Sequence, residues 1–344
     1  MVKKLIVNVV SESEISVQGH GVHTAYVEMV NALKTHADIE VIPGRFNEQL
    51  DCDVVHFHTV GARVWKKLYQ KDAKKVISAH VVPDSFVGSL IGARYWKGVA
   101  ALYLKWFYNR GDVVLAVSDE TKRDLIKLGV KVPIEVFYNF IDTSAYKKKD
   151  KKQAIALRKK LSIPSDAFVV IGCGQVQPRK RIDSFIKVAQ RLPDIHFVWV
   201  GGMPFKQLAA EYQDMKNVME NAPANVHFPG IVELTDMPAY YTMSDAFFLP
   251  SDQETFGLVA IEAAAAGLPV LLRDIPDYKE TFAEYALREK TDEAFATAIR
   301  KLQSDKKLYT TMQQKSTALA ERFDSRQASK RLVQLYRELC YNKK

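Results

Sequence analysis

The chain has 344 residues, of which 47% are hydrophobic and 26% are charged, a composition usual for a globular protein. This length suffices for two domains with separate cores. No apolar stretch approaches the ~20 residues that a helix needs to span a bilayer, and the three cysteines, Cys52, Cys173 and Cys340, show neither metal-ligand spacing nor a disulfide pattern. We therefore expect a protein of the reducing cytoplasm, with no secretory signal and no membrane span.

The net charge of +9 is unevenly distributed along the chain. Residues 61–110 contain ten Lys and Arg but only two acids, Asp72 and Asp84. Such an excess predicts an anionic partner: lipid headgroups, nucleic acid or an acidic substrate.

Strands and helices alternate through the first part of the chain. Strands are expected at residues 4–10, 53–58, 75–79 and 112–117, and helices at residues 22–34 and 119–128. Ser118 is suited to cap the last of these helices. The alternation predicts an α/β fold with a doubly wound parallel sheet, and the charge run at residues 147–152 marks the end of this first domain, residues 1–146.

The same alternation returns after the charge run. Strands are expected at residues 168–172, 196–200, 226–228, 245–250 and 269–272, and helices at residues 183–191 and 258–266. The last twenty residues form an amphipathic helix, which we expect to cross back to the first domain. The boundaries are thus residues 147–324 for the second domain and residues 325–344 for the final helix, with a central cleft between two Rossmann-like domains.

Two glutamates eight positions apart flank the start of the helix at residues 258–266. Glu254 lies in the preceding loop and Glu262 about two helical turns further on. Phe256, Gly257 and Leu258 lie at the N-terminus of the helix, where free N–H groups favour an anion such as phosphate. The pair suits a nucleotide-sugar, although a solvated loop acid and a surface charge would give the same pattern.

Several motifs together resemble the retaining glycosyltransferases of the family 4 type, which have the GT-B fold. They are the segment from Glu254 to Glu262, the turn at residues 267–270, the strand at residues 54–58, Ser118 with Asp119, and the stretch at residues 139–142. The compact chain, with its Gly-Gln-Val-Gln-Pro-Arg-Lys segment at residues 174–180, most resembles the Gram-positive bacterial (di)glycosyl-diacylglycerol synthases. This resemblance implies transfer of a hexose, glucose or galactose, from a UDP-sugar to a glycolipid acceptor, monoglucosyl-diacylglycerol or diacylglycerol, with retention of configuration.

The resemblance also implies roles for individual residues. Lys180, assisted by Arg179, would hold the leaving diphosphate, although Gln175 stands where the family has an arginine. Glu262 would accept hydrogen bonds from the ribose, and Glu254 would bind the donor sugar. No metal and no cofactor are implied, the UDP-sugar being a substrate.

The first domain supplies further candidates at expected strand ends. His80 resembles the histidine that the family places near the reacting sugar, and Gly21 lies in a loop that would approach the donor. His56 and His58 alternate on one strand and so share one face, where they serve packing or catalysis.

The segment at residues 89–110 interleaves aromatic and basic side chains. Such a helix suits a membrane interface, and the alternative is that its aromatic face belongs to the domain core. The acceptor and membrane candidates are Arg94, Trp96, Lys97, Tyr103, Lys105 and Trp106. We expect a cytoplasmic enzyme peripheral on the inner face of the membrane, bound to anionic lipid and not to nucleic acid. The alternatives are a glycosyltransferase acting on a polysaccharide or protein, and a sugar-binding protein without activity.

Overall fold

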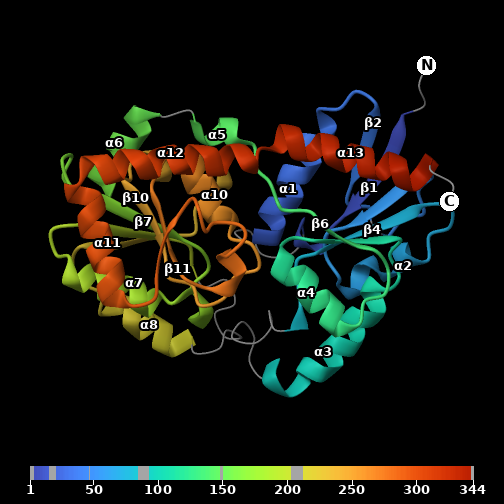
Figure 1. Ribbon diagram of the computed structural model, residues 1–344, viewed down its shortest axis with the longest axis horizontal. Helices are drawn as coiled ribbons and strands as arrows, with labels where there is room; N and C mark the ends of the chain where they lie inside the picture. The colour runs from blue at the N-terminus through green and yellow to red at the C-terminus, as the bar shows by residue number, and fades with distance from the viewer. Residues whose placement is uncertain are drawn as a thin grey trace. The chain divides into compact units, whose positions relative to one another are not determined.

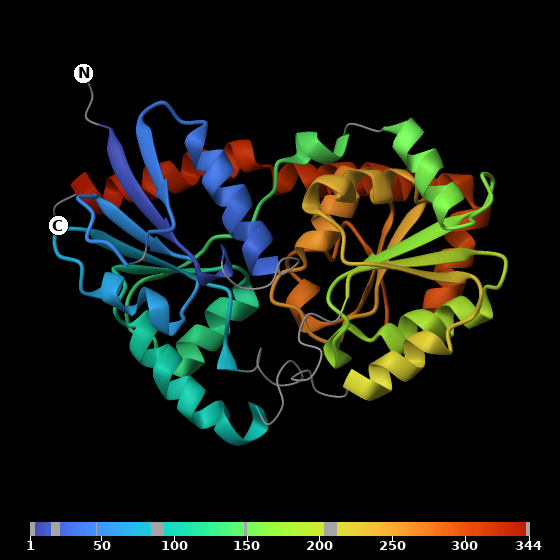
Figure 2. The same ribbon diagram turned by 180° about the vertical axis from the view of Figure 1, so that it is seen from behind.

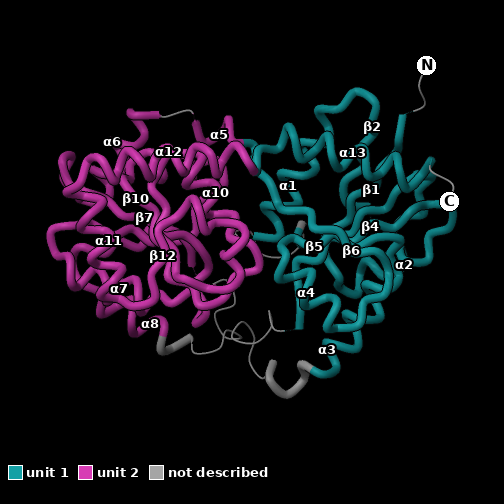
Figure 3. Tube along the Cα trace, in the orientation of Figure 1, with its two compact units in different colours: residues 1–87, 92–142, 323–344 teal, residues 88–91, 143–322 magenta. Residues whose placement is uncertain are grey.

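A computed structural model describes residues 4–14, 21–45, 47–83, 93–147, 150–202 and 212–341, without the side chains of residues 14, 93–97 and 212–214. The described residues form two compact units (Figure 3). The first contains the residues up to Asp142 together with those from Phe323 onward, and the second runs from Thr143 to Arg322.

In its described part, the first unit contains a six-stranded sheet whose paired strands are all parallel. The strand order is β2-β1-β3-β4-β5-β6, so the chain moves outward from β1 to β2 and then reverses to β3. The strands are β1 (Leu5–Val10), β2 (Ile39–Pro43), β3 (Val54–Phe57), β4 (Lys74–Ala79), β5 (Val113–Ala116) and β6 (Ile134–Val136).

Helices accompany this sheet on both faces (Figures 1 and 2). They are α1 (Gly21–Lys34), α2 (Trp65–Leu68), α3 (Ala93–Tyr108), α4 (Asp119–Leu128) and α13 (Ser325–Tyr341). The Ser118 side chain caps α4 by accepting a hydrogen bond from the Thr121 amide at 3.1 Å, as predicted.

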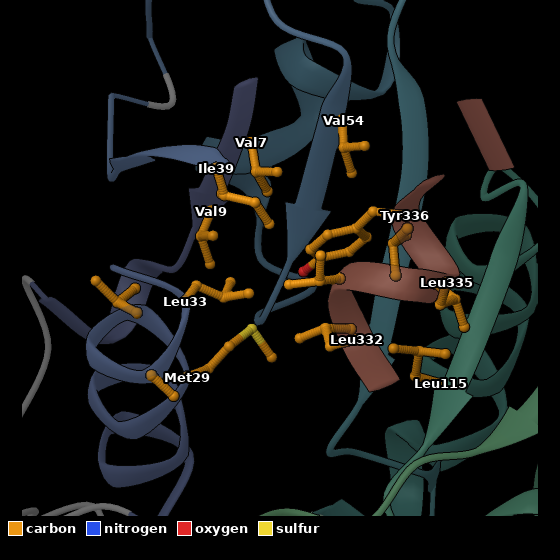
Figure 4. Packing of buried hydrophobic residues seen from close by; sticks show 14 of the residues in the cluster. Val7, Val9, Met29, Leu33, Ile39, Val54, Leu115, Leu332, Leu335 and Tyr336 are labelled. Atoms are coloured by element: carbon orange, nitrogen blue, oxygen red, sulfur yellow. The ribbon is translucent and has the colours of Figure 1, made fainter. Parts of the chain in front are cut away.

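The C-terminal helix α13 is part of the core of the first unit. Leu332, Leu335 and Tyr336 are at most 6% exposed and share one core cluster with Leu33 of α1 and Val54 of β3, with Leu335 lying beside Leu115 of β5 (Figure 4). Burying such side chains stabilises the fold by about 1.5–3 kcal/mol each. The predicted return of the last helix to the first domain is therefore found.

The second unit repeats the architecture, again with every described strand pair parallel. The order β12-β11-β10-β7-β8-β9 places the reversal between β7 and β10. The strands are β7 (Val169–Cys173), β8 (His196–Val200), β9 (Val226–Gly230), β10 (Ala246–Leu249), β11 (Val270–Arg273) and β12 (Leu287–Glu289). The prediction of two doubly wound parallel sheets is confirmed.

The helices of the second unit begin before its first strand. They are α5 (Thr143–Lys147), α6 (Lys151–Lys160), α7 (Ile182–Arg191), α8 (Tyr212–Glu220), α9 (Met237–Thr242), α10 (Leu258–Ala265), α11 (Asp292–Ser304) and α12 (Lys306–Arg322). The unit starts at Thr143, four residues earlier than the predicted boundary, because the buried Tyr146 ring packs 5.9 Å from the ring of Tyr241. The unit ends at Arg322, where residue 324 was expected.

Candidate active site

The candidate donor site of the second unit lies where the strand order reverses. In doubly wound sheets, ligands bind beside the carboxyl ends of the strands at this point. Here the segments after β7 and β10 are residues 174–181 and 250–257, and they carry Lys180 and Glu254. Residues 74 positions apart in the chain therefore meet at one edge of the sheet.

Glycines allow the backbone to approach closely at this edge. A Cβ atom on Gly201 would lie 2.0 Å from the carbonyl oxygen of Gly174, which excludes any larger residue there. Gly257 has a φ of 89° and precedes α10 as its N-cap. Only glycine adopts this conformation readily, so the turn into α10 depends on it.

Lys180 and Glu254 form a buried ion pair. Lys180 is 8% exposed and Glu254 is 7% exposed, and the Lys180 ammonium donates a hydrogen bond to Glu254 Oε1. Arg179 Nη1 lies 3.5 Å from the other carboxylate oxygen. Burial alone would raise the pKa of the Glu254 carboxyl, but the two cations and the hydrogen bonds hold that pKa below its usual range. Glu254 is thus a carboxylate at neutral pH and no solvated loop acid.

Glu262 is also buried, at 3% exposure, and so is no surface charge. Its Oε2 accepts a hydrogen bond of 2.8 Å from the Tyr241 hydroxyl. Burial, followed by the neighbouring Cys173 and Glu262, raises the pKa of Tyr241 well above its usual range, so that the phenol keeps its proton. Phe256 and Leu258, at 4% and 7% exposure, fix the two ends of the turn that starts α10.

An ion-pair network that the sequence did not reveal holds the Glu254 loop. Asp252 accepts a hydrogen bond of 2.9 Å from Arg181 and forms an ion pair with Arg273, whose Nε lies 3.1 Å from Asp252 Oδ1. The Asp252 amide donates to the Arg179 carbonyl at 2.8 Å. Arg181 also binds Asp183 at 2.9 Å. The Arg181 charge is therefore committed to Asp183 and Asp252, whereas that of Lys180 is paired with the donor-site candidate Glu254. Spacing alone does not distinguish these neighbouring cations.

The predicted histidines lie together in the first unit, buried at the carboxyl ends of β3 and β4. His80 Nε2 lies 3.1 Å from His58 Nδ1, and the rings of His56 and His58 are 5.3 Å apart, on one face as predicted. Gly21 is exposed at the first position of α1. The catalytic role of His80 and the donor-binding role of Gly21 stay predictions.

The hydrogen bonds of His58 determine its tautomer. Its Nε2 lies 3.3 Å from the sulfur of Met29, and a thioether can only accept, so Nε2 carries the proton. Burial, then the charges of His80 and His56, hold the pKa of His58 well below its usual range. Neutral His58 therefore accepts at Nδ1, and His80 must donate from Nε2.

The aromatic side chains of α3 pack largely against the domain core, which is the second of the two alternatives stated for this segment. Tyr103 and Trp106 are half-buried and Phe107 is fully buried against the core, whereas Val99 and Leu102 are each 70% exposed. Tyr103 and Phe107 thus face inward, and Val99 and Leu102 face outward. Arg94, Trp96 and Lys97 have side chains outside the described residues.

Hydrogen bonds and ring contacts tie α3 to α2. The Trp65 indole donates to the Tyr103 hydroxyl at 2.7 Å, and the Arg110 guanidinium lies 5.3 Å from the Trp106 ring. Lys105 reaches the C-terminal end of α4, where Gly129 leaves room for it. We call the outward residues Trp65, Tyr69, Val99, Leu102, Trp106 and Arg110 the α2–α3 surface.

The described residues contain neither a membrane-spanning helix nor a cluster of metal ligands. No described helix combines the length and apolar character required to cross a bilayer. Among the residues with described positions, no three His, Cys, Asp or Glu side chains group as metal ligands would.

Solved structures define the class of fold. The chain superposes on sucrose-phosphate synthase from Thermosynechococcus elongatus with a TM-score of 0.81 and 18% identity, covering 98% of this chain and 99% of that one. Anabaena Alr3699/HepE in complex with UDP-glucose gives a TM-score of 0.77 at 17% identity, covering 96% and 99%. The fold is that of GT-B glycosyltransferases.

Sequence comparisons identify the family. The family model "Glycosyltransferase Family 4" matches residues 19–145, and "Glycosyl transferases group 1" matches residues 153–318. The chain is 36% identical over 280 residues to alpha-galactosylglucosyldiacylglycerol synthase of Streptococcus pneumoniae (strain ATCC BAA-255 / R6), covering 80% of this chain and 74% of that protein. The processive diacylglycerol alpha-glucosyltransferase of Acholeplasma laidlawii is 29% identical over 256 residues, covering 73% of this chain and 75% of that protein. The chain belongs to the family 4 glycosyltransferases.

Proposed function

We propose that this glycosyltransferase transfers a hexose, glucose or galactose, from a UDP-sugar to a glycolipid acceptor in a membrane. The acceptor is monoglucosyl-diacylglycerol or diacylglycerol, and the anomeric configuration is retained. The observation that carries the proposal is the buried Lys180–Glu254 pair beside α10, in a chain 36% identical to a synthase named for a glycosylated diacylglycerol.

The leaving diphosphate requires positive charge and hydrogen-bond donors in a site with little water. Lys180 supplies the charge from a position that is already desolvated. Arg179 adds to it, and the backbone amides at Phe256, Gly257 and Leu258 lie at the N-terminus of α10. These groups act without a divalent metal ion.

The glutamates bind hydroxyl groups of the donor. Glu262, oriented by Tyr241, accepts from the ribose, and Glu254 accepts from the hexose. In the absence of donor, Glu254 neutralises Lys180, so diphosphate and carboxylate compete for one ammonium group. Donor binding thereby releases Glu254 to bind the sugar. His80, in the first unit, is the histidine that we assign to catalysis.

The α2–α3 surface anchors the enzyme on the membrane as a peripheral protein. Val99 and Leu102 are exposed apolar side chains, and Arg110 lies beside the Trp106 ring. Aromatic rings and short apolar side chains insert at the headgroup boundary, and basic side chains bind anionic lipid headgroups. Each basic residue near the surface contributes about 1 kcal/mol to the free energy of membrane binding.

The test is UDP release from UDP-glucose and UDP-galactose with vesicles that contain diacylglycerol or monoglucosyl-diacylglycerol. We expect a glycolipid product with an α anomeric proton by NMR, unchanged by EDTA. Turnover on polysaccharide or protein acceptors but not on lipid would refute the acceptor assignment. Loss of turnover in EDTA, restored by a divalent ion, would refute the metal-independent step.

A further inference from the structure

Gln175 carries a buried amide group that the protein itself does not satisfy. It follows β7 at the reversal of the sheet and is only 9% exposed. Its Oε1 accepts a hydrogen bond of 2.9 Å from Gln177 Nε2. Its own Nε2 has no hydrogen-bond partner among the residues that the structure describes. A buried unpaired donor is costly, about 1–3 kcal/mol, and requires an explanation.

A short chain of hydrogen bonds fixes the orientation of this amide. Arg179 Nε donates to Gln177 Oε1 at 3.0 Å. A guanidinium has donors only, so the oxygen of Gln177 faces Arg179 and its NH2 group faces Gln175. The oxygen of Gln175 must then face Gln177. Rotating the Gln175 amide by 180° would oppose two NH2 groups, so it is the NH2 group of Gln175 that is left buried without an acceptor.

The neighbours of that NH2 group select an anionic ligand. A Cβ atom on Gly174, the residue before Gln175, would lie 3.4 Å from Lys180 Nζ, so the ammonium lies over this backbone. A second orphaned polar group, the buried Tyr278 hydroxyl, lies 3.4 Å from the Cβ position of Gly257 at the start of α10. One donor with unused hydrogen-bonding capacity thus lies in the segment after β7, and a second lies beside the start of α10.

We propose that Gln175 Nε2 donates to a phosphate oxygen of the nucleoside diphosphate beside Lys180, and that Gln177 and Arg179 are positioning residues that hold the Gln175 amide in this orientation. The inference rests on the proposed function and refines it. Arg179 acts here through Gln177 and through the Gln253 carbonyl, to which its Nη1 donates at 3.1 Å. The Gln175 amide is then a neutral donor to the diphosphate in addition to the charged and backbone donors named above.

The test is isothermal titration of the protein, without acceptor, with UDP and with UMP. Gln175→Met removes the amide at nearly constant volume. We expect it to weaken UDP binding about ten-fold, which corresponds to about 1.4 kcal/mol, and UMP binding much less. Gln175→Glu, which keeps the shape but cannot donate, should weaken UDP binding at least as much. Gln313→Met, a half-buried glutamine of the same unit that binds the Gly267 carbonyl, is the control and should change neither affinity.

The positioning role is tested by a double-mutant cycle. Gln177→Met should weaken UDP binding several-fold in the wild-type chain but have no further effect in Gln175→Met, because it acts through Gln175. Additive losses would overturn the positioning role. Unchanged UDP affinity in both Gln175 variants, or equal losses for UDP and UMP, would overturn the diphosphate contact while leaving the proposed function intact. A wild-type protein that binds no UDP would instead overturn the proposed function.

Discussion

The hydroxyl of Tyr336 lies 2.5 Å from Nδ1 of His56, and both side chains are fully buried. The pair joins α13 to β3 across 280 positions of the chain. Nε2 of the same imidazole lies 2.8 Å from the Ser78 hydroxyl on β4. Both ring nitrogens of His56 are thus satisfied, and one of them depends on the C-terminal helix.

Tyr336→Phe should destabilise the first unit while preserving the shape of its core. The variant leaves a buried imidazole nitrogen without its partner, for which we expect a loss of about 1–3 kcal/mol in the free energy of unfolding. Urea unfolding measures it. Tyr341→Phe, on the same helix but 57% exposed, should stay within about 0.5 kcal/mol of wild type. Equal midpoints for the two variants would show that the hydrogen bond contributes nothing.

Glu254→Gln should destabilise the second unit in a pH-dependent manner. At pH 7 the variant leaves the buried Lys180 ammonium without a counter-charge, at a cost on the order of 3 kcal/mol. Because the folded protein holds the pKa of Glu254 below its unfolded value, the carboxylate contributes stability above the unfolded pKa. That contribution is lost as the pH falls through the folded pKa. The difference in urea midpoint between wild type and variant should therefore shrink below about pH 4.5, and a constant difference would contradict the assignment.

Most strands that the sequence predicts are buried on both faces, and the exception is the strand predicted at residues 226–228, which is the half-buried edge strand β9. Continuous apolar runs such as residues 196–200 define central strands of parallel sheets. The edge strand β2 was not predicted, because Ile39–Pro43 contains Glu40 and ends in proline. Strands β6 and β12 span only three residues each, and they gain their structure from the neighbouring strand and not from a pattern of their own.

The site could be predicted as a set of residues but not as a set of contacts. Motif spacing identifies Lys180, Glu254 and Glu262 as candidates. Tyr241, the hydrogen-bond partner of Glu262, lies in a segment without a motif. The sequence left two alternatives for α3 for a related reason. This helix is apolar over most of its circumference, so its periodicity cannot distinguish the side that meets the sheet, with Leu104 and Phe107, from the side that bears Leu102.

Leu102→Asp should weaken membrane binding without weakening the fold. The side chain is 70% exposed, so little packing is lost, whereas a carboxylate at the α2–α3 surface would be repelled by anionic lipid. Flotation with vesicles containing phosphatidylglycerol should show several-fold less bound protein. Ile155→Asp, equally exposed at 68% but on α6 of the second unit, is the matched control and should float like wild type. If both variants float equally, the membrane contact lies elsewhere.

Met29→Leu should change the tautomer of His80 through its effect on His58. In the wild type the sulfur of Met29 holds the proton of His58 on Nε2, and His58 Nδ1 in turn holds a proton on His80 Nε2. Leucine preserves the volume but accepts no hydrogen bond, so neutral His58 becomes free to carry its proton on Nδ1 and to donate it to His80.

The 15N chemical shifts of the imidazole nitrogens report these protons directly. We expect His80 of the wild type to be protonated at Nε2, and the Met29→Leu protein to show a mixture of both tautomers with turnover reduced several-fold. His58→Phe, which removes the acceptor altogether, should reduce turnover further. Ile126→Met, a substitution at an exposed site on α4 of the same unit, should change neither spectrum nor rate. A His80 that carries its proton on Nδ1 in the wild type would contradict the relay, since His58 Nδ1 would then face a second lone pair.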